Sequence, residues 1–563
     1  MVKRIFSIFH KEISGLHQAA YLLGFFALCS QVLALFRDRM LAAHFGATGT
    51  LDLYYSAFRI PDFLFATVAS IVSISVLMPY LMDRMDRSNE EAKKFIDAIF
   101  SFFFLFMLVV GLLTFWLAPF FLKILFPPFA GSASFGSLVL LTRILLLSPI
   151  FLGFSNTLAT IVQINKRFFL YSMSPIVYNL GIIFGILFLY PVFGLTGLGF
   201  GVVIGAFLHF AIQMPFIIKQ GLMPSLHFPI DFTIIKNVIY TSISRTLTVS
   251  SNEIAELVLI SFASFLVPGS ISIFNFSFNL QSVPFSIIGV SYSLAAFPTL
   301  TKFFSKGNIT EFIEHMITSS RHIIFWSVPV SILFIVLRAQ IVRVILGSGM
   351  FNWGDTRLTA AASAIFVASL TFQNLTPLFV RSYYSRGKTK IPLYMNMFSS
   401  AVIIGLAYYL VHFFNHNLFF QNFMESLLKV PGVPGTAMLM LPLGFSLGVL
   451  VNCVIHWVGF GLEFRSFSKP VLRTFFEVVT SSIIMGFVAY LGLNFFGAVL
   501  NTWLNINTTF GIFLQGFLSG VSGIIVAVLI LYLLKSKELS EVWSTMHKKI
   551  WKATVVGPDA TLD

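Results

Sequence analysis

The sequence predicts an all-α membrane protein that crosses the bilayer many times. Of its 563 residues, 57% are hydrophobic and only 10% are charged, and the mean hydropathy is +0.89. A soluble domain carries about a quarter charged residues. The apolar residues also gather in runs of the length that a bilayer requires, about 20 residues each. These observations exclude a soluble globular protein, a disordered chain and a collagen-like fibre.

About fourteen such runs follow one another along the chain. Inside hydrocarbon the backbone N–H and C=O groups have no water to bond, so each run is predicted to form a helix. Strands of an outer-membrane barrel would instead be about ten residues long, with alternating polarity. In chain order, the predicted helices lie near residues 16–37, 53–82, 95–125, 136–163, 168–190, 194–218, 234–264, 269–301, 317–338, 358–384, 391–413, 433–462, 470–496 and 509–534.

The basic residues that give the chain its net charge of +14 are distributed as the predicted membrane topology requires. If the N-terminus is cytoplasmic and the helices alternate in direction, most of the 36 Lys and Arg residues fall in cytoplasmic segments. The opposite loops near residues 190–196, 265–270 and 497–508 carry no Lys or Arg. This asymmetry is the positive-inside pattern of membrane proteins. We therefore expect both termini in the cytoplasm, and no nucleic-acid-binding surface.

Short patterns repeat in the two halves of the chain. Pro-x-Leu at 79–81 recurs at 298–300, and Pro-x3-Asn at 175–179 recurs at 392–396. Both offsets are about 220 residues, as expected for two parallel six-helix repeats related by an axis along the membrane normal. We therefore predict an N-lobe at 1–220, a C-lobe at 221–465, two further helices at 466–536 and a cytoplasmic tail at 537–563.

Sequence motifs for catalysis are lacking. There is no nucleotide-binding loop, zinc-protease motif or nucleophile elbow. The glycine-rich stretch at 197–205 lies inside an apolar run, which favours close helix packing over phosphate binding. Cys29 and Cys453 are far apart and offer no metal-ligand spacing. We expect no enzyme activity, no metal, no bound cofactor and no nucleotide partner.

The first candidate site surrounds the first two helices. Arg37, Asp38, Asp52 and Arg59 are charged residues in or beside apolar spans, where charges are costly and usually face a cavity or a partner. Guanidinium groups match phosphate oxygens with two parallel hydrogen bonds, so a cavity that holds Arg37 and Arg59 is suited to a lipid diphosphate. The alternative is that Arg37 pairs with Asp38 or Asp52 at a helix end, and that Arg59 caps a helix or extends toward the membrane surface.

The second candidate site lies in the seventh predicted helix. Glu253 and Glu256 are three residues apart and share a helix face, and Arg245 lies about two turns earlier. Two carboxylates at membrane depth are suited to coupling with Na⁺ or H⁺, because one can take up a proton when it is desolvated beside the other. The alternative is a structural ion pair with Arg245 or with a neighbouring helix.

Several stretches of the chain resemble a known transporter family. These are SQVLALFRDRMLAAHFGATGTLDLYYSAFRIPDFL, INKRFFLYSMSPIVYNLGIIFG, GLTGLGFGVVIGAFLHFAIQMPFIIKQGL, LGSGMFNWGDT and YYSRGKTKIPLY. In this order, over residues 16–465, they resemble the MurJ/MviN family of lipid II flippases in the MOP exporter superfamily. The resemblance implies two six-helix lobes around a cationic cavity, with a groove for the lipid tail at the last two helices. It also implies alternating access that carries an undecaprenyl-diphosphate-linked peptidoglycan precursor from the inner to the outer leaflet of the bacterial cytoplasmic membrane.

The family pattern is only partly kept. Arg37 and Asp52 match functional residues of the family, and Asp38 follows Arg37 as usual. Arg245, Glu253 and Glu256 are additions to the pattern, and Arg59 keeps a basic position. Elsewhere this sequence departs from the expected charged residues, and the departures are Gln31, Phe65, Ser70 and Asn279.

These departures leave alternatives to the leading hypothesis, which is a lipid II flippase driven by an ion gradient or by the membrane potential. One alternative is a divergent member that flips another polyprenyl-linked glycan. A second is a MATE-like antiporter of the same superfamily, although the arginines argue against it. A third is a membrane scaffold that does not transport. For the leading hypothesis, the expected partners are a lipid-linked oligosaccharide and the membrane lipids.

Overall fold

The structure is a computed structural model that describes residues 16–71, 74–502, 505 and 508–551. All regular secondary structure in these ranges is helical, which confirms the predicted all-α class. The Arg245 side chain, although part of a candidate site, lies outside what the structure describes. The chain forms two compact units, and each is described by itself. Unit 1 comprises Met1–Val283, Ile345–Phe366 and Thr389–Asn452, and unit 2 comprises Pro284–Val344, Val367–Lys388 and Cys453–Asp563.

Unit 1 contains most of the N-terminal helices and several later ones. They are α2 (Leu16–Phe45), α3 (Gly49–Ile71), α4 (Ile74–Arg87), α5 (Asn89–Leu125), α6 (Pro127–Ala130), α7 (Phe135–Leu145), α8 (Leu147–Ile164), α9 (Phe168–Phe184), η1 (Gly185–Leu189), α10 (Tyr190–Phe193), α11 (Leu195–Ala211), α12 (Met214–Lys219), α13 (Phe232–Ser264), most of α14 (Ser270–Phe285) and of α18 (Trp353–Ala368), α20 (Lys390–His416), α21 (Leu418–Leu428), η3 (Thr436–Leu439) and the first half of α22 (Met440–Glu463).

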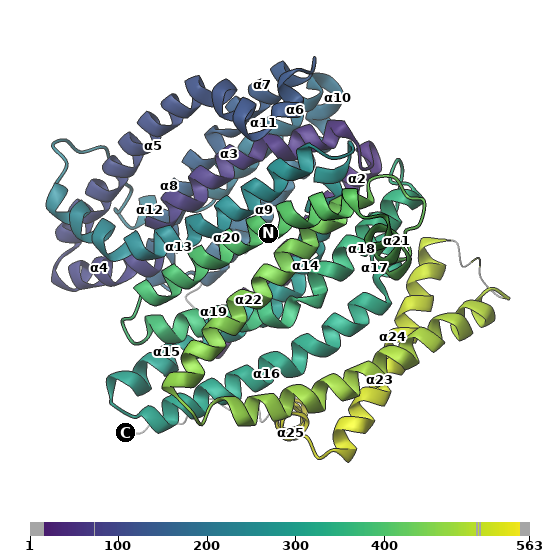
Figure 1. The fold of residues 1–563 in the computed structure, drawn as a ribbon. Coiled ribbons are helices and arrows are strands. Elements are labelled where there is room, and N and C mark those ends of the chain that lie inside the picture. Colours follow the sequence, from purple (N-terminus) through teal and green to yellow (C-terminus); the bar gives the residue numbers. More distant parts are fainter. Residues whose placement is uncertain (1–15, 72–73, 503–504, 506–507, 552–563) are drawn as a thin grey trace. The chain divides into compact units, whose positions relative to one another are not determined.

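Local sequence explains how these helices start and pack. The Ser88 hydroxyl caps α5 by accepting the Glu91 N–H at 3.1 Å, in the Ser-x-x-Glu pattern of a capping box. Helix α9 packs along α11 and α2 (Figure 1). A side chain at Gly181 or Gly185 would overlap the backbone of α11 at Gly205 or Gly201. The glycines therefore permit close helix contact, as the sequence predicted.

Unit 2 is built around the long helices that follow residue 284. It contains η2 (Ser286–Val290), α15 (Ser291–Ser305), α16 (Ile309–Val336), most of α17 (Arg338–Leu346), α19 (Leu370–Tyr384), the second half of α22, α23 (Ser468–Leu500), α24 (Thr509–Leu533) and α25 (Lys537–Trp551). Helix α23 packs along both α24 and α16 (Figure 1). A cluster of buried apolar side chains from α15, α16, α19, α22 and α23 forms the core of this unit.

Ten helices of the described chain are long and apolar enough to cross a membrane, and eleven if the bent pair α18 and α19 is one span. The protein is therefore a multi-pass membrane protein, but the predicted count of about fourteen spans is not confirmed. The three predicted spans outside this count lie at 16–37, 53–82 and 234–264, that is, in α2, α3–α4 and α13. These three carry the charged residues of both candidate sites. The predicted lobes, C-terminal helix pair and tail stay a prediction.

Candidate functional site

Arg37 and Arg59, the two arginines of the first candidate site, both line one polar cavity inside unit 1. Its volume is ≈ 260 Å³, and α2, α3, α9, α13 and α14 surround it. The lining residues are Arg37, Leu41, Tyr54, Tyr55, Phe58, Arg59, Asp62, Tyr178, Ile182, Glu256, Asn275, Phe278 and Asn279. Two arginines and two carboxylates thus share a hollow within helices that otherwise consist mainly of apolar residues. Charges at this depth mark a ligand pathway or a pair of partners.

Arg37 is held by its neighbour in the chain. Its Nε and Nη2 atoms donate to Asp38 Oδ1 at 3.0 and 2.8 Å, and Nη1 donates to Asn179 Oδ1 at 3.2 Å. The other oxygen of Asp38 accepts from Asn279 Nδ2 at 2.9 Å. Asp38 is 2% exposed, so both of its oxygens have partners in a dry environment. Asn279, where the family resemblance predicts an arginine, therefore serves as a neutral donor to Asp38.

Arg59 of α3 joins two other helices. Its Nη1 atom pairs with Glu256 Oε1 of α13 at 2.6 Å, and its Nη2 atom donates to Asn275 Oδ1 of α14. Asn275 is fixed in turn, because its Nδ2 atom donates to the Ile271 carbonyl at 2.8 Å. Within the described chain, the buried Arg59 Nε atom has no hydrogen-bond partner. The arginine thus keeps one unused donor.

The remaining predicted site residues take different positions. Asp52 does not line the cavity. Its carboxylate accepts from the N–H groups of Gly269 and Ser272 at 2.6 and 2.7 Å and from the Ser272 hydroxyl at 2.6 Å. Because these groups lie at the start of α14, the Asp52 carboxylate caps that helix. Its negative charge also stabilises the positive end of the helix dipole. Glu253 lies one turn before Glu256 and is not a lining residue.

Sequence reasoning missed the neutral part of this cavity. Tyr54, Tyr55 and Tyr178 line it, and the buried Tyr55 hydroxyl has no hydrogen-bond partner among the described residues. The sequence marks Asn179 only as part of the internal repeat, and it does not single out Asn275. An asparagine inside an apolar helix is a usable signal, because a buried amide needs partners. Which amide reaches which arginine is decided by helix packing alone.

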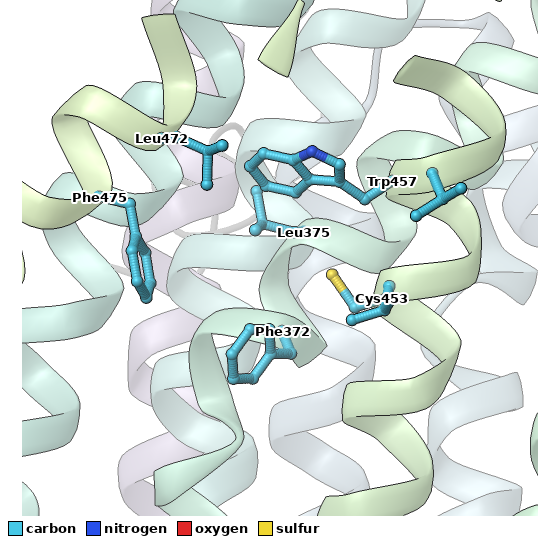
Figure 2. A pocket seen from close by; sticks show the side chains of 8 residues that line it. Phe372, Leu375, Cys453, Trp457, Leu472 and Phe475 are labelled. Atoms are coloured by element: carbon cyan, nitrogen blue, oxygen red, sulfur yellow. The ribbon is translucent and has the colours of Figure 1, made fainter. Parts of the chain in front are cut away.

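A second hollow lies within unit 2 and is chemically different. This pocket of ≈ 240 Å³ is lined by Phe372, Leu375, Cys453, Val454, Trp457, Val458, Leu472 and Phe475. Figure 2 shows these side chains arriving from α19, α22 and α23 around the space. The one strong polar group of the lining, the Trp457 Nε1–H, donates to Ser468 Oγ at 3.1 Å. The pocket offers only apolar surface to an occupant.

Comparisons with solved structures define the class of this fold. The structure matches one described as lipid II flippase MurJ in an inward closed conformation, with a TM-score of 0.71 and 22% identity, over 91% of this chain and 99% of that one. It also matches an inward-facing MATE family multidrug resistance transporter of the MOP superfamily, with a TM-score of 0.64 and 14% identity, over 78% and 96% of the two chains. A multi-pass helical fold shared with MOP transporters thus encloses the cavity.

Sequence comparisons identify the family within that class. Residues 41–514 match the family described as Lipid II flippase MurJ, so the chain belongs to the MurJ family. A probable lipid II flippase MurJ of Bdellovibrio bacteriovorus is 29% identical over 412 residues, covering 70% of this chain and 78% of the relative. That of Buchnera aphidicola subsp. Acyrthosiphon pisum is 25% identical over 395 residues, covering 69% and 77%. The predicted family is confirmed.

Proposed function

We propose that this protein carries lipid II, the undecaprenyl-diphosphate-linked peptidoglycan precursor, from the inner to the outer leaflet of the bacterial cytoplasmic membrane. The observation that carries the proposal is the unit 1 cavity, where Arg37 and Arg59 lie among membrane-embedded helices. The diphosphate is the part of such a lipid whose negative charge most needs positive compensation in a low-dielectric environment. Guanidinium groups supply it, because they stay charged and bind phosphate oxygens in pairs.

The cavity residues have distinct roles in this proposal. Arg37 and Arg59 hold the diphosphate, with Arg245 as a further cation, and Asp38 orients Arg37 through the two hydrogen bonds between them. Asp52 keeps α14 in register beside the cavity, because it caps the start of that helix. Glu253 and Glu256 couple the cycle to Na⁺ or H⁺. An ion gradient or the membrane potential drives alternating access, and both termini are cytoplasmic.

A second candidate function is the transport of another polyprenyl-diphosphate-linked glycan. The observation that favours it is Asn279, a neutral cavity residue bonded to Asp38 where the family pattern has an arginine. A cavity with fewer cations can still hold one diphosphate, although it binds the attached sugars differently. Flipping assays with lipid II and with an undecaprenyl-diphosphate glycan without the stem peptide would separate the two functions.

The main test is complementation. A bacterium depleted of its own lipid II flippase should grow when this chain is expressed, and outward-facing lipid II should return. Arg37→Ala should lower the flipping rate about tenfold or more, since hydrogen bonds to charged groups contribute about 1.5–3 kcal/mol.

The matched control is Arg87→Ala. Arg87 pairs with Asp83 on an exposed helix surface, where both side chains are more than half exposed. Such pairs contribute little, so the control should restore growth as the wild type does. Failure of the correctly inserted wild-type chain to restore outward-facing lipid II would refute the proposal.

A further inference from the structure

Each cavity arginine already has an anionic partner within the chain. Arg37 pairs with Asp38 at 2.8 Å, and Arg59 pairs with Glu256 at 2.6 Å. Asp62 adds another carboxylate to the lining. With all these groups ionised, the cavity has no excess positive charge. An incoming anion would therefore meet guanidinium groups that are already neutralised.

The two pairs differ in how readily an anion could open them. Arg37 and Asp38 are adjacent in one helix, and Asp38 is almost fully buried with both oxygens bonded. The Arg59–Glu256 pair instead joins α3 to α13, and the Glu256 side chain is 24% exposed. Glu256 occupies a single Arg59 nitrogen, Nη1, and leaves Nε unused. In the second pair, therefore, a ligand can take the place of Glu256 beside Arg59.

We propose that Glu256 is a resident counter-ion, which holds Arg59 while the cavity is empty and is displaced by the substrate diphosphate. This inference rests on the proposed function and names the step that loading requires. The exchange keeps the buried Arg59 charge paired throughout, and an unpaired buried charge would be strongly unfavourable. A diphosphate also has more acceptor oxygens than a carboxylate, so it can replace Glu256 at Nη1 and still accept from other donors of the cavity.

Displacement has a consequence for the neighbouring acids. Released Glu256 would face Asp62 across the cavity and Glu253 one turn away on α13. Like charges at short distance in a low-dielectric site repel strongly. A cation taken up by these carboxylates relieves that repulsion. Glu256 therefore links lipid loading to cation uptake, so that the two ligands favour each other's binding.

The test measures undecaprenyl diphosphate binding to the purified full-length protein in lipid nanodiscs. Glu256→Gln keeps the side-chain shape and removes the competing charge, so the affinity should rise about tenfold, within the usual range for coupled sites. In an Arg59→Gln background the same substitution should give no gain. A merely structural role for Glu256 predicts weaker binding instead, in both backgrounds.

Two control variants separate the effect of breaking the Arg59–Glu256 pair from the effect of net charge. Glu253→Gln removes the same charge from the same helix without breaking the Arg59 pair, so its gain should be clearly smaller. Glu477→Gln removes a carboxylate that pairs with Arg473 on the surface of α23, and it should not change the affinity. A gain for Glu253→Gln equal to that for Glu256→Gln would overturn the proposal, because net charge alone would then explain it.

A further variant covers the case in which Glu256→Gln does not fold. Glu256→Asp keeps the charge but shortens its reach toward Arg59, and it should give an intermediate gain in affinity; unchanged affinity would overturn the inference. If the wild-type chain binds undecaprenyl diphosphate and neither variant binds it more tightly, only the inference fails. If neither the wild-type chain nor the variants bind this lipid, the proposed function fails with it.

Discussion

Two hollows of similar size, the polar cavity of unit 1 and the apolar pocket of unit 2, differ in whether charged side chains line them. Their volumes are ≈ 260 and ≈ 240 Å³. In the first, arginines and carboxylates lie among apolar and aromatic side chains, whereas the second is lined by aliphatic and aromatic side chains and Cys453 (Figure 2). Size therefore does not identify a functional site in this protein. The cost of burying charge does, because charges remain in a membrane helix only where a partner or a ligand compensates them.

The helices around the two hollows differ only in part. Among the described residues, the polar cavity is lined from α2, α3 and α13, which are not counted as spans, and from α9 and α14, which belong to counted spans. The pocket of unit 2 is built from α22 and α23, which do count, and from α19 of the bent pair. We infer that the apolar pocket serves packing, while the polar cavity serves ligand binding. The predictions below test this division.

The largest effect is expected from placing a cation in the apolar pocket. Leu375 lines that pocket and is 1% exposed. Leu375→Arg would bury a charge without a partner, which costs about 3–5 kcal/mol or more, so little monodisperse protein should be recovered after size-exclusion chromatography. Leu375→Met, which nearly conserves volume, should behave as the wild type. Normal recovery of Leu375→Arg would show that the pocket accepts a charge, which would contradict its assignment to packing.

A smaller effect, of opposite sign, is expected from a cation added to the polar cavity. Asn279→Arg places a guanidinium beside Asp38, which already accepts a hydrogen bond from this position. The variant should fold, and it should bind undecaprenyl diphosphate several-fold more tightly in nanodiscs, because cavity charge is raised by one unit. Asn279→Gln is the neutral control and should leave the affinity near the wild-type value. Loss of folded protein would show that the cavity does not accept a third cation.

The smallest effect concerns a buried carboxylate at the edge of unit 2. Glu538 of α25 is 2% exposed and accepts hydrogen bonds from Thr474 and Ser536, both at 2.8 Å, and it pairs with Arg321 at 2.6 Å. Burial alone would raise the pKa of Glu538, but these hydrogen bonds and the arginine hold the pKa below its ordinary value. The contact therefore stabilises α25 above about pH 4.3, the ordinary glutamate pKa. The stabilisation is lost as the pH falls through the lowered value.

A spin label at the exposed Ser544 should report this change. Its motion should stay restricted at neutral pH and increase in acid, as α25 leaves its contacts with α16 and α24. In Glu538→Gln the label should be more mobile at neutral pH and should respond little to acid. A label whose mobility does not depend on pH in the wild type would contradict the assignment of Glu538 as the anchor of this helix.

Much of the site could be predicted from residues alone. The cost of charges in apolar runs predicts that Arg37 and Arg59 face a cavity, and both line one; that it binds a ligand stays a prediction. The alternative reading of the same residues also holds in part, since Arg37 does pair with Asp38. Glu256 was assigned to ion coupling, and its contact with Arg59 comes from a helix nearly two hundred residues away in sequence. Its coupling role stays a prediction.

The contacts of Asp52 could not be predicted from the sequence. The family resemblance marks it as functional, and it is one of the two aspartates considered as partners of Arg37. In the structure it caps α14 instead, more than two hundred residues later in the chain. Sequence offers no means to derive this contact, because a carboxylate satisfies an arginine and a helix N-terminus by the same chemistry. Only the packing of α3 against α14 selects one of them.

The sequence by itself determined the helical membrane class and the few charges worth attention, because the bilayer restricts both backbone and charge so severely. The family resemblance came from particular stretches of sequence. The tertiary structure decided which of those charges meet. It placed Arg37 beside Asp38 on one helix and Arg59 beside Glu256 of another helix, and it left the lining of the second hollow without charge. The physical reason is that an ion pair depends on distances between helices, which helical periodicity does not encode.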